Sequence, residues 1–314
     1  MKHWLTHGLT GGLGVVVIAT TLLTLTGYLG SVHYLFDLTA HFKLQYLIAT
    51  LMALVWFSFI RHKSLILLCF FCAGLNLWAI VPWYLPQLQP AIQRGQPLRV
   101  LTANVLVENT NYAPTIELIR EEQPDVVAIV ESSFNWIKAM RSVQDILPYS
   151  VESPRARAFG IVLYSKYPLT LESVKTFDAP KDYHLVATIN INDRPAKIVA
   201  LHPPPPRDKI LFEHRNRELI EIGEYVRSVN GPVIALGDLN ITMWSPNYQK
   251  FIQQSNLLNT RLGFGILPSW PTHLPILQIP IDHILVNSSV QVINTRMGPN
   301  ISSDHLPVIA DLAY

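Results

Sequence analysis

Three long apolar segments fill the first 85 residues of the 314-residue chain, at about 9–30, 44–60 and 65–85. Because a helix needs about 20 apolar residues to cross the hydrocarbon core of a bilayer, each segment predicts a transmembrane helix. A signal peptide would explain only one of the three segments, and a buried helical domain would carry more charge. We therefore expect residues 1–85 to form a three-helix transmembrane anchor.

The hydrophobic pattern changes after residue 85. Residues 86–96 contain two prolines and a glycine, which is typical of a short stiff linker. Residues 97–314 instead show short apolar runs bounded by turn residues, the pattern of buried strands, together with helical periodicity at 113–122 and 208–228. The pattern predicts a separate α/β domain over 97–314 that is long enough to fold alone.

Charge is distributed unevenly between these parts. Residues 1–96 hold five of the 24 Lys and Arg and one of the 22 Asp and Glu. This leaves 97–314 with 19 basic against 21 acidic residues, a net charge of −2. Because proteins that grip extended duplex DNA present a clearly basic surface, this balance argues against duplex DNA as a partner.

Basic residues also predict the orientation of the anchor. Lys2 precedes the first segment, and Arg61 and Lys63 lie between the second and third. Since Lys and Arg favour the cytoplasmic side of a membrane, these loops are expected inside and 97–314 outside. The sequence thus predicts an integral protein of the inner or plasma membrane, with its large domain periplasmic or extracellular.

Cys69 and Cys72 have the C-x-x-C spacing of some redox and metal sites. Leucines and phenylalanines flank them, however, and a thiolate would be poorly solvated there. We interpret both as apolar thiols that face lipid or another helix.

Polar residues follow the predicted strands of 97–314. Glu131 closes the apolar run 126–130, and Asp238 and Asn240 follow the run 233–236. Two other runs end in Asn104 and His202, whereas Asp282 and the Ser303-Asp304-His305 triplet stand at the start of two further strand-like runs. Each residue alone would often be only a turn former or a solvated strand end. Gathered at one rim of a sheet, they have the composition of a metal-assisted hydrolase site.

The ordered set of these motifs resembles the endonuclease/exonuclease/phosphatase superfamily across 97–314, and 279–283 looks like its compact, membrane-anchored bacterial members. The resemblance implies a four-layer α/β sandwich of two mixed β-sheets flanked by helices. It also implies hydrolysis of a phosphoester with Mg²⁺ or Mn²⁺.

The resemblance implies a role for each matching residue. Glu131 would hold the metal, with Asn104 beside it and Asp304 as a further acid. Asp238 would orient or deprotonate the attacking water, and Asn240 would bind the phosphate. His202 and His305 would contact the phosphoryl oxygens, with Asp282 fixing His305. The neighbouring His283 is expected to be structural. Arg155 and Arg157 are weaker candidates for phosphate binding, since a solvated loop would explain them equally well.

The donor types support a hard cation independently. A phosphoester is anionic and its transition state gains negative charge, which a hard cation on carboxylate oxygens neutralises. Mg²⁺ keeps several water ligands and therefore needs only one or two carboxylates. The large domain has neither cysteine nor an H-E-x-x-H motif, which makes zinc the less favoured metal.

One departure bears on the substrate. Abasic-site endonucleases that the chain resembles have an acidic residue two positions after the Asn, where this chain has Leu106. Only 34 residues separate His202 from Gly237, which leaves no room for long basic loops. We therefore predict a membrane-anchored phosphodiesterase or phosphomonoesterase for which a lipid or lipid-linked substrate fits best. A membrane-tethered nuclease and a catalytically silent binding domain are the alternatives.

Overall fold

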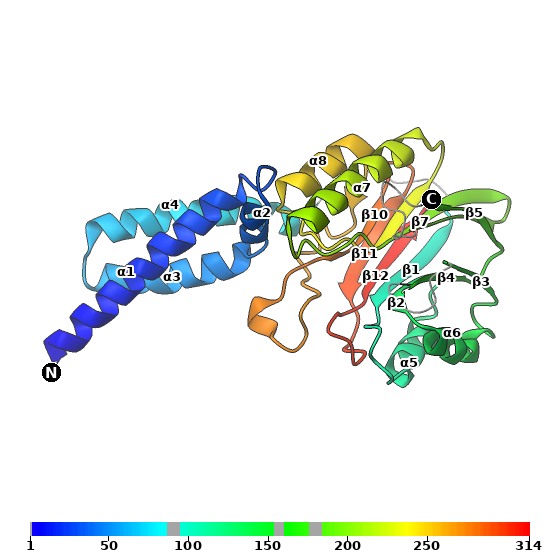
Figure 1. Ribbon diagram of the computed structural model, residues 1–314, viewed down its shortest axis with the longest axis horizontal. Helices are drawn as coiled ribbons and strands as arrows, with labels where there is room; N and C mark the ends of the chain where they lie inside the picture. The colour runs from blue at the N-terminus through cyan, green and yellow to red at the C-terminus, as the bar shows by residue number, and fades with distance from the viewer. Residues whose placement is uncertain (1, 87–94, 154–159, 176–183) are drawn as a thin grey trace.

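The computed structural model describes residues 2–86, 95–153, 160–175 and 184–314. An elongated helical segment, residues 2–86, projects from a rounded α/β sandwich formed by the residues from 95 onward (Figure 1). Most of the predicted linker and both weak arginine candidates, Arg155 and Arg157, lie outside the described residues.

The helical segment contains two helices that are long and apolar enough to cross a membrane. They span Gly8–Gly27 and Lys63–Tyr84. The middle predicted span, 44–60, corresponds to helix α3, which has 17 residues. It is long enough to cross a membrane only together with α2, and the two helices are bent by 63° relative to each other. The elements are α1 (Lys2–Gly27), α2 (Tyr34–Ala40), α3 (Lys43–Phe59), α4 (Lys63–Ile80) and the 3₁₀ helix η1 (Val81–Tyr84).

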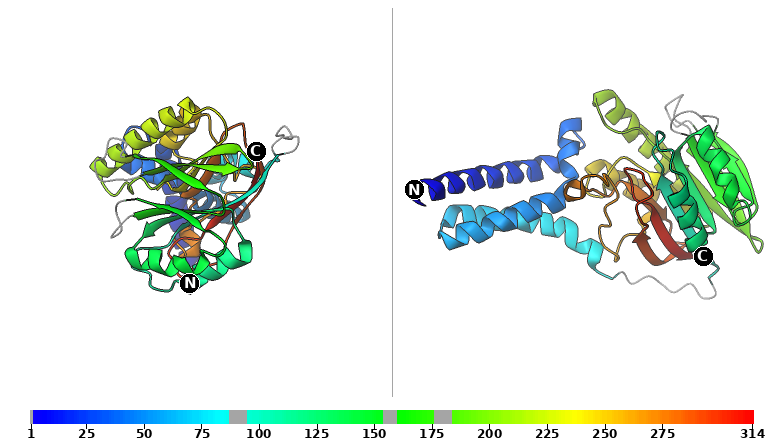
Figure 2. Two further views of the ribbon diagram at one scale, coloured as in Figure 1. Left: turned by 90° about the vertical axis from the view of Figure 1, so that its right-hand side faces the viewer. Right: turned by 90° about the horizontal axis from the view of Figure 1, so that it is seen from below.

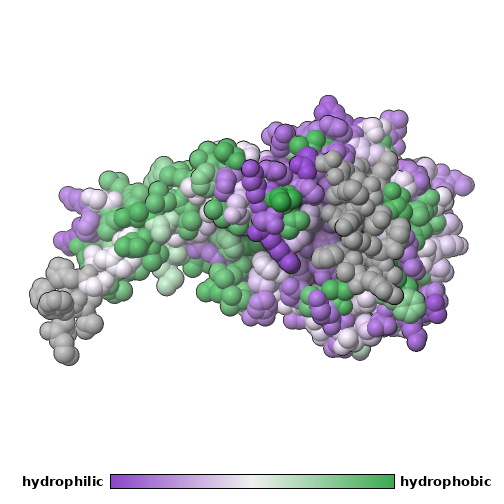
Figure 3. Space-filling view, in the orientation of Figure 1, coloured by the Kyte–Doolittle hydropathy of each residue, from purple (hydrophilic) through white to green (hydrophobic). Residues whose placement is uncertain are grey.

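Apolar side chains predominate on the face of this segment that Figure 3 shows, and many large ones are exposed. Phe59 and Trp78 are each more than 80% exposed. The interior combines a small apolar cluster around Phe57 with buried polar groups, among which the Thr50 hydroxyl donates a hydrogen bond to Cys72 Sγ at 3.4 Å. Both cysteines are buried and free, which confirms the interpretation of Cys69 and Cys72 as helix-facing thiols.

Two six-stranded mixed sheets form the sandwich. The first has the order β11-β12-β1-β2-β4-β3 and the second β5-β6-β7-β8-β10-β9. The strands are β1 (Pro97–Asn104), β2 (Val126–Ser132), β3 (Tyr149–Glu152), β4 (Gly160–Ser165), β5 (Leu169–Lys175), β6 (His184–Ile191), β7 (Arg194–Leu201), β8 (Val233–Asp238), β9 (Leu258–Asn259), β10 (Asp282–Val286), β11 (Gln291–Met297) and β12 (Val308–Ala313).

Successive apolar residues of a strand point to opposite faces of its sheet, so both faces of each sheet carry buried apolar side chains. One core lies between the sheets and draws on both, for example through Val100, Val130, Ile198 and Ile234. Helices cover the two outer faces, so the predicted four-layer sandwich is confirmed (Figure 2). These helices are α5 (Ala113–Glu122), α6 (Phe134–Met140) and the 3₁₀ turn η2 (Arg141–Val143) on the first sheet, and α7 (Lys209–Ser228) and α8 (Pro246–Ser255) on the second; a 3₁₀ turn, η3 (Pro275–Leu277), lies in the loop before β10.

The helical segment packs against the second sheet's outer layer. Four of its residues, Leu47, Ala73, Ile80 and Trp83, belong to the hydrophobic core beneath α7 and α8. Polar contacts reinforce this packing, since the indole of Trp244 donates a hydrogen bond to the Ala79 carbonyl at 3.1 Å. The two parts of the chain are therefore joined by buried contacts as well as by the connecting residues.

The shared core sharpens the prediction that 97–314 folds alone. We expect a truncated protein of these residues to be soluble and to unfold cooperatively, because two of its three cores draw only on residues after 97. Its melting temperature should be lower than that of the full chain, since each kcal/mol of lost packing costs about 2–4 °C in a domain of this size. Thermal unfolding followed by circular dichroism measures both properties. Insoluble aggregate under varied conditions would contradict the prediction.

Candidate active site

The strands bring the predicted polar residues to one edge of the sandwich. Strands β1 and β2 are parallel and pair Asn104 with Val130. Asn104 and Glu131 therefore lie at the same end of two neighbouring strands. In the second sheet, the antiparallel β8 and β10 pair Asp238 with Asp282 directly. Gly237 is required here, because its φ is +144° and an added Cβ would lie 1.9 Å from the Leu201 carbonyl oxygen.

Asn104 connects the two sheets at the site. Its amide Nδ2 donates to Glu131 Oε1 at 3.0 Å and to Asp238 Oδ2 at 3.1 Å. Its Oδ1 accepts from the backbone N–H of Leu106 at 3.0 Å, which fixes the orientation of the amide. Glu131 is held on the other side as well, since its Oε2 accepts from the N–H of Val107 at 3.3 Å.

Two histidines flank the Asp238 carboxylate. The Nε2 atoms of His202 and His305 lie 3.8 and 3.7 Å from Asp238 Oδ2. His202 also approaches Glu131 Oε1, at 3.7 Å. The two imidazoles thus face the same small volume as the two carboxylates.

Asp282 stands behind His305 and sets its protonation. Its Oδ2 lies 2.8 Å from His305 Nδ1, which therefore carries the donated proton and leaves Nε2 toward Asp238. Burial lowers the pKa of His305, but the negative charges of Asp282 and Asp238 outweigh it and raise that pKa to about 10. Burial and the charge of Asp282 raise the pKa of Asp238 to about 7. These shifts favour a positively charged His305 ring next to Asp238, and they give the Asp238 carboxylate a higher proton affinity than a solvent-exposed Asp has.

Three hydrogen bonds fix the position of Asn240. Its N–H donates to Asp238 Oδ1 at 2.9 Å, and its side-chain Nδ2 donates to the Pro203 carbonyl at 3.0 Å. Its own carbonyl accepts from Arg215 Nη1 at 3.0 Å. The fully buried Arg215 in turn forms a 2.7 Å ion pair with Asp37 of α2, so this loop is tied to the helical segment.

The donor set suits a hard cation. Glu131, His202 and Asp238 place one ligand atom each within 4.8 Å of one another, as do Asp238, Asp282 and His305. Asp304 lies nearby: its Oδ2 accepts from Trp270 Nε1 at 3.0 Å, whereas its buried Oδ1 accepts no hydrogen bond from the described residues. Carboxylate oxygens that remain available in this way fit Mg²⁺ or Mn²⁺.

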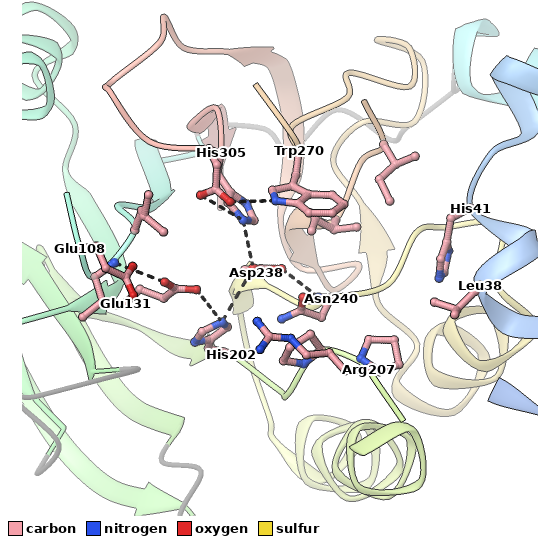
Figure 4. A pocket seen from close by; sticks show the side chains of 17 residues that line it. Leu38, His41, Glu108, Glu131, His202, Arg207, Asp238, Asn240, Trp270 and His305 are labelled. Carbon is pink, nitrogen blue, oxygen red and sulfur yellow. Dashed lines mark hydrogen bonds and ion pairs between the residues drawn. The ribbon is translucent and has the colours of Figure 1, made fainter. Parts of the chain in front are cut away.

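These side chains open into a cavity of about 560 Å³ (Figure 4). Six predicted site residues line it, and two others, Asn104 and Asp282, lie behind them. The six are Glu131, His202, Asp238, Asn240, Asp304 and His305. Arg207 and Trp270 also line the cavity and were not predicted. Arg207 directly follows the run of four prolines after His202, which was the only signal for it in the sequence.

His283 points away from this cavity. It is fully buried, and its Nε2 donates to the Ile241 carbonyl at 2.8 Å while its Nδ1 accepts from the Asn259 amide at 2.9 Å. Burial, with the nearby charge of Arg261, lowers the pKa of His283 to about 3. This neutral, doubly hydrogen-bonded ring supports the structural role expected for it.

Comparison with known proteins agrees with this geometry. The sequence model of the endonuclease/exonuclease/phosphatase family matches residues 101–305. A search of curated proteins finds no match.

Solved structures share the fold at low identity. A D. rerio TDP2 complexed with single-strand DNA product is 14% identical with a TM-score of 0.60, over 69% of this chain and 99% of that one. The 3′ phosphatase NExo from Neisseria, bound to product DNA hairpin, is 17% identical with a TM-score of 0.55, over 68% and 98%. Sphingomyelinase C from Streptomyces griseocarneus is 15% identical with a TM-score of 0.51, over 69% and 99%.

Proposed function

The chain belongs to the endonuclease/exonuclease/phosphatase family, and we propose that it is a membrane-anchored, Mg²⁺- or Mn²⁺-dependent phosphodiesterase or phosphomonoesterase. The observation that carries this proposal is the convergence of Glu131, Asp238, His202 and His305 around the amide of Asn104. In a catalytically silent binding domain, loss of at least one of these groups would be expected.

The side chains divide the chemistry among themselves. Glu131, with Asn104 and Asp304 as its helpers, would hold the cation, which supplies charge neutralisation and an acidified water when bound. Asp238 would orient the attacking water and accept its proton, a task for which a pKa near neutrality is suited. His305 and His202 would donate to the phosphoryl oxygens as charge builds on them, with Asp282 keeping His305 in place. Asn240 would bind a phosphate oxygen.

A lipid or lipid-linked phosphoester fits this chain better than duplex DNA. Two of the similar structures hold DNA products, and a third is a sphingomyelinase, so the fold itself leaves the substrate open. The net charge of −2 over 97–314 supplies little of the phosphate neutralisation on which non-specific DNA affinity depends. The apolar helices favour a substrate that is already in the membrane.

A substrate screen tests the proposed activity. The purified full chain with Mg²⁺ would be incubated with bis-p-nitrophenyl phosphate, p-nitrophenyl phosphate, phospholipids, nucleotides and plasmid DNA. We expect hydrolysis of at least one phosphoester, with lipids preferred over plasmid. Preferential cleavage of the plasmid would support the membrane-tethered nuclease instead, and failure on every substrate would count against an enzyme.

The proposed domains keep the bounds predicted from the sequence: an anchor over 1–85, a linker over 86–96 and a catalytic domain over 97–314. The catalytic domain is proposed to lie outside the cytoplasm. Lys2, Arg61 and Lys63 support this orientation, since they mark the inner side. Alkaline phosphatase fused after residue 97 should be active in an enteric bacterial host. An inactive phosphatase fusion together with a fluorescent cytoplasmic reporter at the same point would reverse the orientation.

A further inference from the structure

The helical segment forms part of the wall of the catalytic cavity. Leu38 and His41, at the C-terminal end of α2, line the same cavity as Glu131, Asp238 and His305 (Figure 4). His41 is fixed there by a 2.9 Å hydrogen bond between its Nδ1 and the Thr242 hydroxyl. The side chain of Leu38 remains 37% exposed. The cavity therefore extends from the catalytic groups to an apolar side chain of the predicted anchor.

A long uncharged stretch of the sandwich lies against the same helices. Residues 262–281 contain no Asp, Glu, Lys or Arg, although charged residues flank the stretch at both ends. The carbonyl of Trp83 accepts hydrogen bonds from the N–H groups of Gly263 and Gly265 at 3.0 and 2.8 Å. Near the other end, Gln45 of α3 donates to the carbonyls of Ile276 and Gln278 at 3.2 and 3.0 Å. The stretch is thus held on the side of the sandwich that faces the helical segment.

The tip of this stretch exposes apolar side chains. Leu274, Ile276 and Leu277 are 42%, 73% and 41% exposed, so packing on the helices does not cover them. We call residues 274–278, the orange loop beside the helical segment in Figure 1, the apolar lip. Farther along the same stretch, Ile279 and Ile281 line the catalytic cavity. Apolar side chains of one stretch therefore lie both in the cavity wall and on the exposed lip, beside the helical segment.

We propose that the apolar lip enters the bilayer and that the cavity takes the phosphoester of a membrane lipid, whose hydrocarbon chains pass between Leu38 and the lip. This inference rests on the proposed function, because it assigns a substrate class and an entry route to the same site. The lipid phosphate lies at the boundary of the hydrocarbon core. The candidate span Lys63–Tyr84 ends where Trp83 contacts Gly263 and Gly265 of the sandwich, so that boundary would fall at this junction. A water-soluble substrate needs neither the lip nor the wall formed by α2.

The inference is tested in proteoliposomes that report on both kinds of substrate. The full chain is reconstituted with Mg²⁺ in vesicles of equal parts phosphatidylcholine, phosphatidylethanolamine and phosphatidylglycerol. Mass spectrometry measures lipid hydrolysis, and absorbance measures hydrolysis of added bis-p-nitrophenyl phosphate. The quantity compared between variants is the ratio of the lipid rate to the soluble rate, which cancels differences in the amount of active enzyme.

Two variants and two matched controls separate the lip and the wall from unspecific effects. Ile276→Asp places a carboxylate in the lip, and Leu171→Asp makes the same change at an exposed leucine on β5, at the end of the sandwich far from the helices (Figure 1). Leu38→Gln changes the cavity wall, whereas Leu35→Gln changes a 50% exposed leucine of the same helix that does not line the cavity. Thermal unfolding of each variant checks its folding.

We expect Ile276→Asp and Leu38→Gln to lower the ratio at least about tenfold, because a polar group in hydrocarbon is costly. Both controls should keep the wild-type ratio. Equal ratios in variants and controls would overturn the inference. So would wild-type enzyme that hydrolyses bis-p-nitrophenyl phosphate and leaves all three lipids intact, although the proposed function would then stand. If the wild type hydrolyses neither substrate, the proposed function itself fails.

Discussion

Stripping divalent metal from the purified protein is expected to abolish hydrolysis of bis-p-nitrophenyl phosphate. The site combines the carboxylates of Glu131, Asp238 and Asp304 with imidazoles and an amide, and it contains no thiol among the described residues. Without a cation, the negative charge of the substrate would face these carboxylates directly. The measurement is the rate after EDTA treatment and desalting, with residual metal determined by mass spectrometry.

Re-addition of metal serves as the control. Mg²⁺ or Mn²⁺ should restore the rate, since both prefer oxygen ligands. Undiminished activity in protein shown to be free of metal would overturn the assignment of a metal-dependent mechanism.

The second large effect is expected from Asp238 and His305, which we propose to act on the attacking water and on the phosphoryl oxygens. Asp238→Asn and His305→Ala should each lower kcat by at least about two orders of magnitude, because general-base and positioned-proton contributions are typically 10²–10⁴-fold. Asn at 238 is similar in shape but accepts no proton at neutral pH. Removal of the His305 ring takes away the positively charged imidazole that Asp282 holds beside Asp238. Steady-state kinetics on purified variants of matched thermal stability measure both losses.

Two further variants make this result specific. The double variant should lose less than the product of the single effects, because both residues act on one chemical event. His283→Ala should change kcat only modestly and mainly lower the melting temperature, since the ring is buried away from the cavity. A kcat near the wild-type value in Asp238→Asn would refute the assigned mechanism whatever the stability of the protein.

The polar ends of the strands were predictable from the sequence because their cause is local. An apolar run that ends in Glu131 or in Gly237-Asp238 places the polar group at the rim of a buried sheet. The packing of the two sheets then brings the rims together, where Asn104 contacts both carboxylates. The resemblance then supplied the sandwich of two mixed sheets in which these rims meet. Eight of the predicted residues consequently converge on one site, in and directly behind the cavity.

The contacts between the helical segment and the sandwich were not predictable, because they join positions far apart in the sequence. In the sequence, Asp37 is only an isolated acidic residue between two predicted spans. In the structure it forms a buried ion pair with Arg215, 178 positions away. Leu38 and His41 precede the predicted span 44–60, and no local pattern in the sequence places them in the cavity that Asp238 and His305 line. The predicted middle span, 44–60, coincides with helix α3, whereas the short helix α2 and its 63° bend from α3 were not predicted.

The central claim is that Glu131 holds a catalytic cation, and a Mg²⁺ titration of Glu131→Gln tests it most directly. Glutamine keeps the size of the side chain but removes the charge that binds the metal. We expect the Mg²⁺ concentration for half-maximal hydrolysis of bis-p-nitrophenyl phosphate to rise at least about tenfold, because even the outer partners of metal ligands are worth 10–100-fold in affinity. A Mg²⁺ dependence identical to that of the wild type would contradict the account.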